Sequence, residues 1–261
     1  MTDYQTALSQ CLSEQTATIA SHTLASGETV WVRKVGKHVP QWRYAALGLL
    51  SKVFKLGALQ PVPNLGGEAA LAIEARRLQE LEQAGVPAPK LLAQSRKAIM
   101  FSCLGANGFM HEIENPATQL ASFAEGLAAI ARVHKAGQYL SQVFIRNIIR
   151  QSDGGIGFID FEDDPLLHMQ LLQCQCRDYL CYLQSSATWL ERTGNLSETV
   201  AIWCRHFQSL PENLQTALRK NYLRVLWLRK LTAGWMGSDT RRLSALAQLL
   251  YQAEKIQQNS Q

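Results

Sequence analysis

The sequence lacks long apolar runs, C-x-x-C cysteine pairs and a strong excess of either charge. Its 261 residues carry 26 Lys and Arg against 21 Asp and Glu, a net charge of +5. A membrane-spanning helix needs roughly 20 mainly apolar residues, and no such run occurs. The six cysteines show no C-x-x-C spacing, which argues against a structural zinc site, and no secretory signal precedes them. We therefore expect a cytoplasmic protein with reduced cysteines.

What the sequence does contain is a clear hairpin signal near its middle. An Asp-Gly-Gly turn at residues 153–155 separates two apolar stretches, 148–149 and 156–159. This turn between β-branched residues is typical of a β-hairpin. The hairpin would bring Asn147, before its first strand, next to Asp160, after its second. An amide oxygen and a carboxylate at one rim suit Mg²⁺, which completes its shell with water and phosphate.

The segment 134–164 resembles the catalytic part of the protein-kinase-like superfamily. There, H-R-D-x-x-x-x-N is followed by a hairpin that ends in D-F-G. In this resemblance Asn147 matches the metal-binding Asn, and the tripeptide DFE that begins at Asp160 matches D-F-G. The position of the catalytic Asp, five residues before Asn147, is Gln142. The metal-binding half of the motif is therefore kept, whereas an amide replaces the catalytic base.

Four carboxylates follow the hairpin within five residues, at Asp160, Glu162, Asp163 and Asp164. Neighbouring like charges repel one another unless a cation is close, so this cluster favours Mg²⁺; a solvated acidic loop is the alternative. The resemblance implies that Asn147, Asp160 and Glu162 hold the metal ion and that Asp160 also serves catalysis. It leaves Gln142 to orient the substrate hydroxyl, as a glutamine orients water in GTPases.

The resemblance also places an ATP-binding lysine near the N-terminus. Strands are expected over 16–19 and 29–35, and side chains two residues apart share a strand face. Val30, Val32 and Lys34 thus share one face, and Lys34 resembles the V-A-I-K lysine that holds nucleotide phosphates. The alternative is a lysine that extends from the strand end into water. No G-x-G-x-x-G loop accompanies it.

A helix is expected over 66–84, because an apolar stripe ends there at a Gly-Val-Pro sequence. From Glu74 the pattern E-x-x-x-L-x-x-L-x-x-x-G-V-P-x-P is similar to that of bacterial sugar and lipopolysaccharide kinases and of antibiotic phosphotransferases. The resemblance implies that Glu74 pairs with Lys34 at the ATP site, with Glu68 as the competing choice.

The remaining segments complete a two-lobed outline. A basic amphipathic helix at about 41–60 either packs on its own domain or lies on a membrane surface. Residues 102–105 resemble a hinge between lobes, and Asp178 is expected to hold the catalytic loop. Helices are expected over 116–135, with Asn115 as cap, and over 166–190, 195–208, 214–231 and 240–256.

Together these signals indicate an α+β, two-lobed kinase-like fold, with a small antiparallel sheet and one helix in residues 1–104 and a mostly helical lobe in 105–261. The nearest relatives by resemblance are bacterial lipopolysaccharide (Kdo-type) kinases and RIO-like atypical kinases. The implied function is an ATP- and Mg²⁺-dependent phosphotransferase acting on a hydroxyl of a sugar, lipid-linked or protein substrate. A nucleotide-binding pseudokinase and an unrelated α+β protein are the alternatives; no nucleic-acid-binding module is found.

Overall fold

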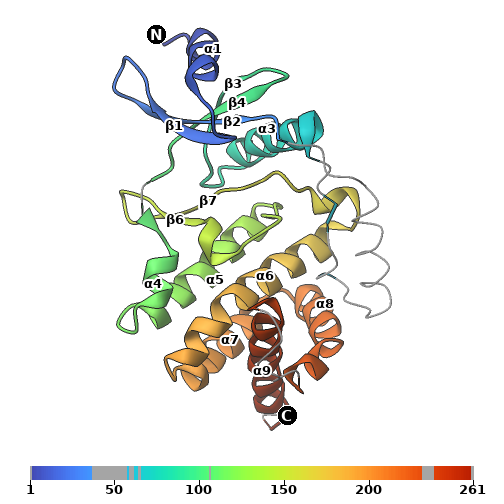
Figure 1. The fold of residues 1–261 in the computed structure, drawn as a ribbon. Helices are drawn as coiled ribbons and strands as arrows, with labels where there is room; N and C mark the ends of the chain where they lie inside the picture. Colours follow the sequence, from blue (N-terminus) through green and yellow to red (C-terminus); the bar gives the residue numbers. More distant parts are fainter. Residues whose placement is uncertain are drawn as a thin grey trace.

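The computed structural model describes residues 2–36, 58, 62–63, 66–105, 107–230 and 238–259. A half built around a small antiparallel sheet precedes a mostly helical half (Figure 1). The α+β fold expected from the sequence is thereby confirmed. The amphipathic helix expected at 41–60 lies outside the described residues, except for Ala58. The exact boundary between the lobes stays a prediction.

The first half is a four-stranded antiparallel sheet in the order β1-β2-β4-β3, with a helix on either side (Figure 1). Its strands are β1 (Ile19–Thr23), β2 (Thr29–Lys34), β3 (Leu91–Gln94) and β4 (Ala98–Ser102), and its helices are α1 (Tyr4–Glu14) and α3 (Gly67–Gln83). The strand expected over 16–19 instead begins at Ile19, and its turn into β2 contains Gly27 in a left-handed conformation.

Helix α1, which the sequence analysis left without structure, decides how the sheet is oriented. Asp3 caps the helix by accepting hydrogen bonds from the backbone N–H groups of Gln5 and Thr6. Its Leu8 packs in one apolar cluster with Val30 and Val32 of β2, both fully buried. Since strand side chains alternate, the intervening residues Trp31 and Arg33 point to the opposite face, toward the helical half.

The expected hairpin is present as part of a second small sheet. Its strands are β5 (Asn107–Gly108), β6 (Ile148–Arg150) and β7 (Ile156–Phe158). Ile148 pairs with Phe158, and Arg150 with Ile156. At the turn, Gly154 adopts a positive φ and the N–H of Gly155 donates to the Asp153 carboxylate, as the turn chemistry predicts.

The helical half is built around α6 (Leu171–Arg192), which contacts α5, α7, α8 and α9 (Figure 1). Its other helices are α4 (Met110–Glu114), α5 (Gln119–Lys135), α7 (Leu196–Ser209), α8 (Glu212–Leu223) and α9 (Ser238–Asn259), with short 3₁₀ turns η2 (Ile145–Asn147), η3 (Pro165–Leu167) and η4 (Leu226–Lys230). Helix α5 begins three residues later than expected, because Asn115 caps a preceding turn by accepting from the N–H of Ala117.

Candidate functional site

A cavity of about 280 Å³ lies where the sheet faces the β6–β7 hairpin. Its apolar lining includes Trp31, Phe101, Leu104 and Ile149, and its polar lining comes from Arg33, Glu74, Asn147 and Asp160. An apolar pocket with a few convergent polar groups is the usual form of a small-molecule site. Near the expected hinge, a side chain on Gly105 would come within 2.9 Å of the Arg150 carbonyl, so the backbone runs close to the hairpin there.

Arg33 joins the two halves of the molecule at this cavity. Its Nε lies 3.2 Å from Oε2 of Glu74 on α3, and its Nη2 lies 3.4 Å from Oδ1 of Asp160. Its Nη1 also pairs with Glu162. Burial alone would lower the pKa of Arg33, but the three carboxylates outweigh it and raise the pKa. One guanidinium therefore holds the carboxylates together across the cleft.

Glu74 is the buried member of this cluster, with 3% of its surface exposed. Burial raises its pKa to about 7, because a carboxylate loses its hydration there, while the nearby Arg33 partly opposes the shift. The ion pair with Arg33 therefore lowers a pKa that burial by itself would raise further.

Asn147 and Asp160 meet as the hairpin predicts. The N–H of Ile159 donates to the Asn147 carbonyl at 2.9 Å, which extends the hairpin pairing to the site. Asn147 Nδ2 donates to the carbonyl of Gln142 at 3.0 Å and lies 3.3 Å from Asp160 Oδ2. With the amide nitrogen held by Gln142, the amide oxygen of Asn147 is the atom suited to a cation.

The backbone of Asp160 itself is strained. Asp160 and Ser141 are the non-glycine residues with positive φ in the described part of the chain, at 73° and 72°. Such conformations cost about 1–3 kcal/mol each and cluster at functional sites. Both lie in the segments that carry the candidate site.

These oxygens fit Mg²⁺ in a particular way. Among the described residues, no group of three or more His, Cys, Asp or Glu side chains could enclose a metal ion. Mg²⁺ is commonly held by one or two carboxylates together with substrate phosphates and waters, so Asn147 and Asp160 suffice in number. Glu162, the third expected ligand, is 35% exposed and pairs with Arg33.

Gln142 is placed by Asp163, which the sequence analysis named only as a member of the acidic cluster. Its Nε2 donates to Oδ2 of Asp163, which is 7% exposed. Burial raises the pKa of Asp163 to about 6, with a further contribution from Glu162. The hydrogen bond fixes which end of the amide faces Asp163 and leaves the other end, Oε1, as an acceptor.

Asp178 supports this loop from α6, as expected. Its Oδ2 accepts a hydrogen bond from the N–H of Leu140 at 2.9 Å and contacts His134 Nε2 at 3.0 Å. Asp178 is fully buried, and these contacts compensate for the lost hydration of its Oδ2 atom. The structure gives His134 this supporting position rather than a place in the cavity.

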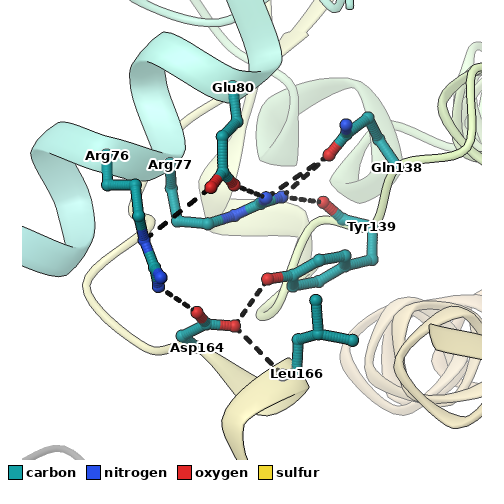
Figure 2. A network of polar contacts seen from close by, with 7 residues as sticks. All are labelled: Arg76, Arg77, Glu80, Gln138, Tyr139, Asp164 and Leu166. Carbon is teal, nitrogen blue, oxygen red and sulfur yellow. Dashed lines mark hydrogen bonds and ion pairs between the residues drawn. The ribbon is translucent and has the colours of Figure 1, made fainter. Parts of the chain in front are cut away.

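A second group of contacts ties α3 to the loop around the candidate site (Figure 2). Arg77 is 1% exposed; its Nη2 donates to the Tyr139 carbonyl at 2.9 Å, and its guanidinium stacks 3.9 Å from the centre of the Tyr139 ring. The Tyr139 hydroxyl donates to Asp164, which also pairs with Arg76 and accepts from the N–H of Leu166. We name Arg76, Arg77, Tyr139 and Asp164 the α3 clasp.

Lys34 requires a correction. Its Nζ donates to the backbone carbonyl of Gln15, on the α1 side of the sheet, and Lys34 is not among the residues that line the cavity. Val30, Val32 and Lys34 do share a face, but that face packs against α1. The cation at the cavity is the neighbouring residue, Arg33, which the alternation of the strand places on the other face.

Sequence reasoning thus found Glu74, Asn147, Asp160 and Glu162, which the structure brings together, and Gln142 beside them. It missed Arg33, the contact between Gln142 and Asp163, and the α3 clasp. The sequence feature that could have identified Arg33 is the helix at residues 4–14. Because that helix covers the face of β2 that carries Val30 and Val32, the other face, which carries Arg33, is turned toward the cleft.

Comparison with known proteins adds little to this geometry. No family model and no curated protein matches the chain. Among solved structures, the Rio2 kinase from Chaetomium thermophilum is 16% identical, with a TM-score of 0.42 over 90% of this chain and 70% of that one. The complex of that kinase with ADP, Mg²⁺ and phosphoaspartate is 18% identical, with a TM-score of 0.40 over 93% and 68%. At these values the likeness carries no functional weight.

In the described part of the chain, no helix is both long and apolar enough to cross a bilayer.

Proposed function

We propose that this protein is an ATP- and Mg²⁺-dependent phosphotransferase of the kinase-like superfamily, acting on a hydroxyl of a sugar, lipid-linked or protein substrate. The observation that carries the proposal is Arg33, which contacts Glu74 of α3 and Asp160 after the hairpin at the same cavity. Phosphoryl transfer depends mainly on positioning and on neutralising the charge of the phosphates. The cavity offers a cation, hard oxygen ligands and an apolar wall together.

In this assignment the nucleotide base lies against the apolar lining near Trp31 and Leu104, and Arg33 neutralises phosphate charge. Asn147 and Asp160 would hold Mg²⁺ through their oxygens, and the bound ion would supply positive charge next to the phosphates. Glu162 is partly exposed, and its carboxylate would provide a further oxygen ligand for the metal ion.

Gln142 takes the position of the missing base. Its Nε2 is held by Asp163, so its Oε1 is free to accept a hydrogen bond from the substrate hydroxyl and orient the attacking oxygen. General-base help is typically worth about 10²–10⁴ in rate, so an amide at this position predicts slow transfer rather than none.

A pseudokinase that binds nucleotide without transfer is the second candidate. The observation that favours it is the replacement of the catalytic Asp by Gln142. Arg33 also already has three carboxylate partners, which compete with phosphate.

The test is the thermal stability of the protein with and without ATP and Mg²⁺. A ligand at a hundredfold excess over its Kd stabilises the native state by about 2.7 kcal/mol. We expect a Mg²⁺-dependent shift in the wild type, its loss in Asp160→Ala, and its retention in Asp153→Ala at the tip of the same hairpin. No shift at millimolar ATP would refute the proposal. Phosphorus NMR then follows the conversion of ATP to ADP with sugar, lipid-linked and protein hydroxyl acceptors added. A stability shift without any conversion in their presence would favour the pseudokinase.

A further inference from the structure

The positive charge of this protein is concentrated in its C-terminal part. Residues 219–255 carry eight of the 26 Lys and Arg but only two of the 21 Asp and Glu, at Asp239 and Glu254. The net charge of this stretch, +6, is larger than the +5 of the whole chain, so the rest of the molecule is almost balanced. None of its described residues lines the candidate nucleotide cavity. A strongly charged surface on an otherwise balanced protein attracts partners of the opposite charge.

Contacts among α8, η4 and α9 gather several of these cations on one side of the helical half. Helices α8 and α9 lie side by side (Figure 1), joined by the ion pair of Arg219 with Glu254, which is 5% exposed. Arg229 of η4 lies 4.1 Å and Lys255 of α9 lies 4.9 Å from the centre of the Tyr251 ring. Lys255 and Arg229 lower the pKa of Tyr251, as expected where positive charge gathers.

The outward face of α8 continues this surface with further cations. Lys220 and Arg224 of α8 and Lys230 of η4 are exposed, and in the part of the chain that the structure describes none of them forms an ion pair. Leu223 lies among them with 45% of its surface exposed. Residues three and four apart are neighbours on a helix, so Lys220, Leu223 and Arg224 share one face. That face combines cations with an exposed apolar side chain.

An anionic lipid bilayer fits both properties of this surface. Lys and Arg near the headgroups are attracted by the negative surface potential of such a bilayer. Their aliphatic parts, together with Leu223, can lie against the apolar boundary beneath the headgroups while the cationic ends stay with the phosphates. The phosphates of a nucleic acid would also attract the cations, but a nucleic acid has no apolar layer for Leu223.

We propose that the outer surface of α8, η4 and α9 binds the face of an anionic lipid bilayer. Lys220, Arg224 and Lys230 lie against the phosphates of the headgroups, and Leu223 enters the interface between headgroups and acyl chains. The neighbouring cations of α9 widen the charged contact. The contact is peripheral, because only side chains enter the lipid. This proposal does not depend on nucleotide binding at the candidate site.

The test measures how much protein sediments with lipid vesicles as the lipid concentration increases. We expect binding to vesicles of equal parts phosphatidylglycerol and phosphatidylcholine, none to pure phosphatidylcholine, and weaker binding as salt rises. Each Lys or Arg near an anionic surface strengthens binding roughly fivefold, so Lys220→Gln/Arg224→Gln should bind roughly twenty- to thirtyfold more weakly. Leu223→Gln keeps the charge and should bind roughly three- to tenfold more weakly, because it removes the apolar contact.

The double variant Arg96→Gln/Lys97→Gln is the matched control, because it removes the same charge from the exposed turn between β3 and β4. It should leave vesicle binding unchanged, and melting without lipid checks that every variant folds. Duplex DNA serves as the competing polyanion. Three results would overturn the proposal: no sedimentation of the folded wild type with the anionic vesicles, an equal loss in the control variant, or tighter binding to DNA that Leu223→Gln leaves unchanged.

Discussion

At the scale of single residues, Arg33 both stabilises the fold and lines the candidate nucleotide site. Its side chain is 19% exposed and that of Glu74 4% exposed, so removing the cation leaves a buried carboxylate without its partner. Breaking such a pair from one side costs about 3–5 kcal/mol. We expect Arg33→Met to lower the free energy of unfolding by about 3 kcal/mol, measured by urea denaturation, and to abolish stabilisation by ATP and Mg²⁺.

The double variant Arg33→Met/Glu74→Met separates the two effects. It removes the stranded carboxylate, so stability should largely return while the ATP effect stays lost. Lys34→Met is the matched control, since Lys34 faces α1, and it should keep the response to ATP. Loss of that response in Lys34→Met, with retention in Arg33→Met, would show that our assignment of the strand face is mistaken.

Gln142 and Asp163 form a pair whose chemistry predicts the effect of restoring an aspartate. Gln142→Asp places two carboxylates together, and like charges at such a distance disfavour joint ionisation. We expect a loss of about 1–2 kcal/mol in the free energy of unfolding at pH 8. The loss should be smaller at pH 5, where Asp163, with its pKa raised to about 6, is protonated in the folded protein.

The compensating variant for this pair is Gln142→Asp/Asp163→Asn, which restores one amide and one carboxylate with their positions exchanged. Its stability should approach that of the wild type at both pH values, and it is the better variant in which to look for faster phosphoryl transfer. Equal stability of Gln142→Asp and wild type at pH 8 would argue against the contact.

At the scale of elements, the α3 clasp fixes the helix that carries Glu74. The Tyr139 hydroxyl donates to Asp164, whose side chain is 3% exposed (Figure 2). Leaving a buried acceptor short of a donor costs about 1–3 kcal/mol. We therefore expect Tyr139→Phe to lower the free energy of unfolding by about 1–2 kcal/mol and to weaken ATP stabilisation, because α3 is held less firmly.

Tyr4→Phe is the matched control for this substitution. The Tyr4 hydroxyl also donates to a carboxylate, that of Glu28, but Tyr4 lies on α1, away from the cavity. Because this hydroxyl is exposed to solvent, its removal should leave the stability nearly unchanged and the ATP response intact. If both substitutions weakened the ATP response equally, the clasp would have no special role in positioning α3.

The elements also show what the sequence could predict. The hairpin that brings Asn147 to Asp160 was predictable, because turn residues and β-branched residues act locally. Which face of β2 lies toward the cleft was not predictable. Strand side chains alternate between two faces, and only the packing of one face against α1 decides which one is left for the cleft. The partnership of Gln142 with Asp163 joins residues 21 apart and depends on the path of the loop between them.

At the scale of the whole molecule, stability below neutral pH is the sum of opposing contributions. The pKa values of Asp163 and Glu74 are raised to about 6 and about 7, chiefly by burial. For a carboxyl with a raised pKa the folded protein binds more protons than the unfolded chain, so stability falls as pH rises through that window. A buried histidine with a lowered pKa has the opposite effect over nearly the same pH range, because it makes stability fall as pH falls.

His206 of α7 is that histidine. Its Nε2 lies 3.1 Å from the Tyr179 hydroxyl, and burial, with some contribution from His134, lowers its pKa to about 4. Between pH 4 and 6.5 the unfolded chain therefore binds more protons at this position, and stability falls as pH falls.

We expect His206→Gln to remove this dependence, so that the stability difference between wild type and variant grows by roughly 1–2 kcal/mol from pH 4.5 to 6.5, with allowance for partial exposure. Urea denaturation across that range measures it, and His168→Gln, which removes an exposed histidine, is the control that should show no such growth. A constant difference for His206→Gln would mean that the imidazole titrates alike in the folded and unfolded protein, and the carboxyls alone would then set the acid side of the stability curve.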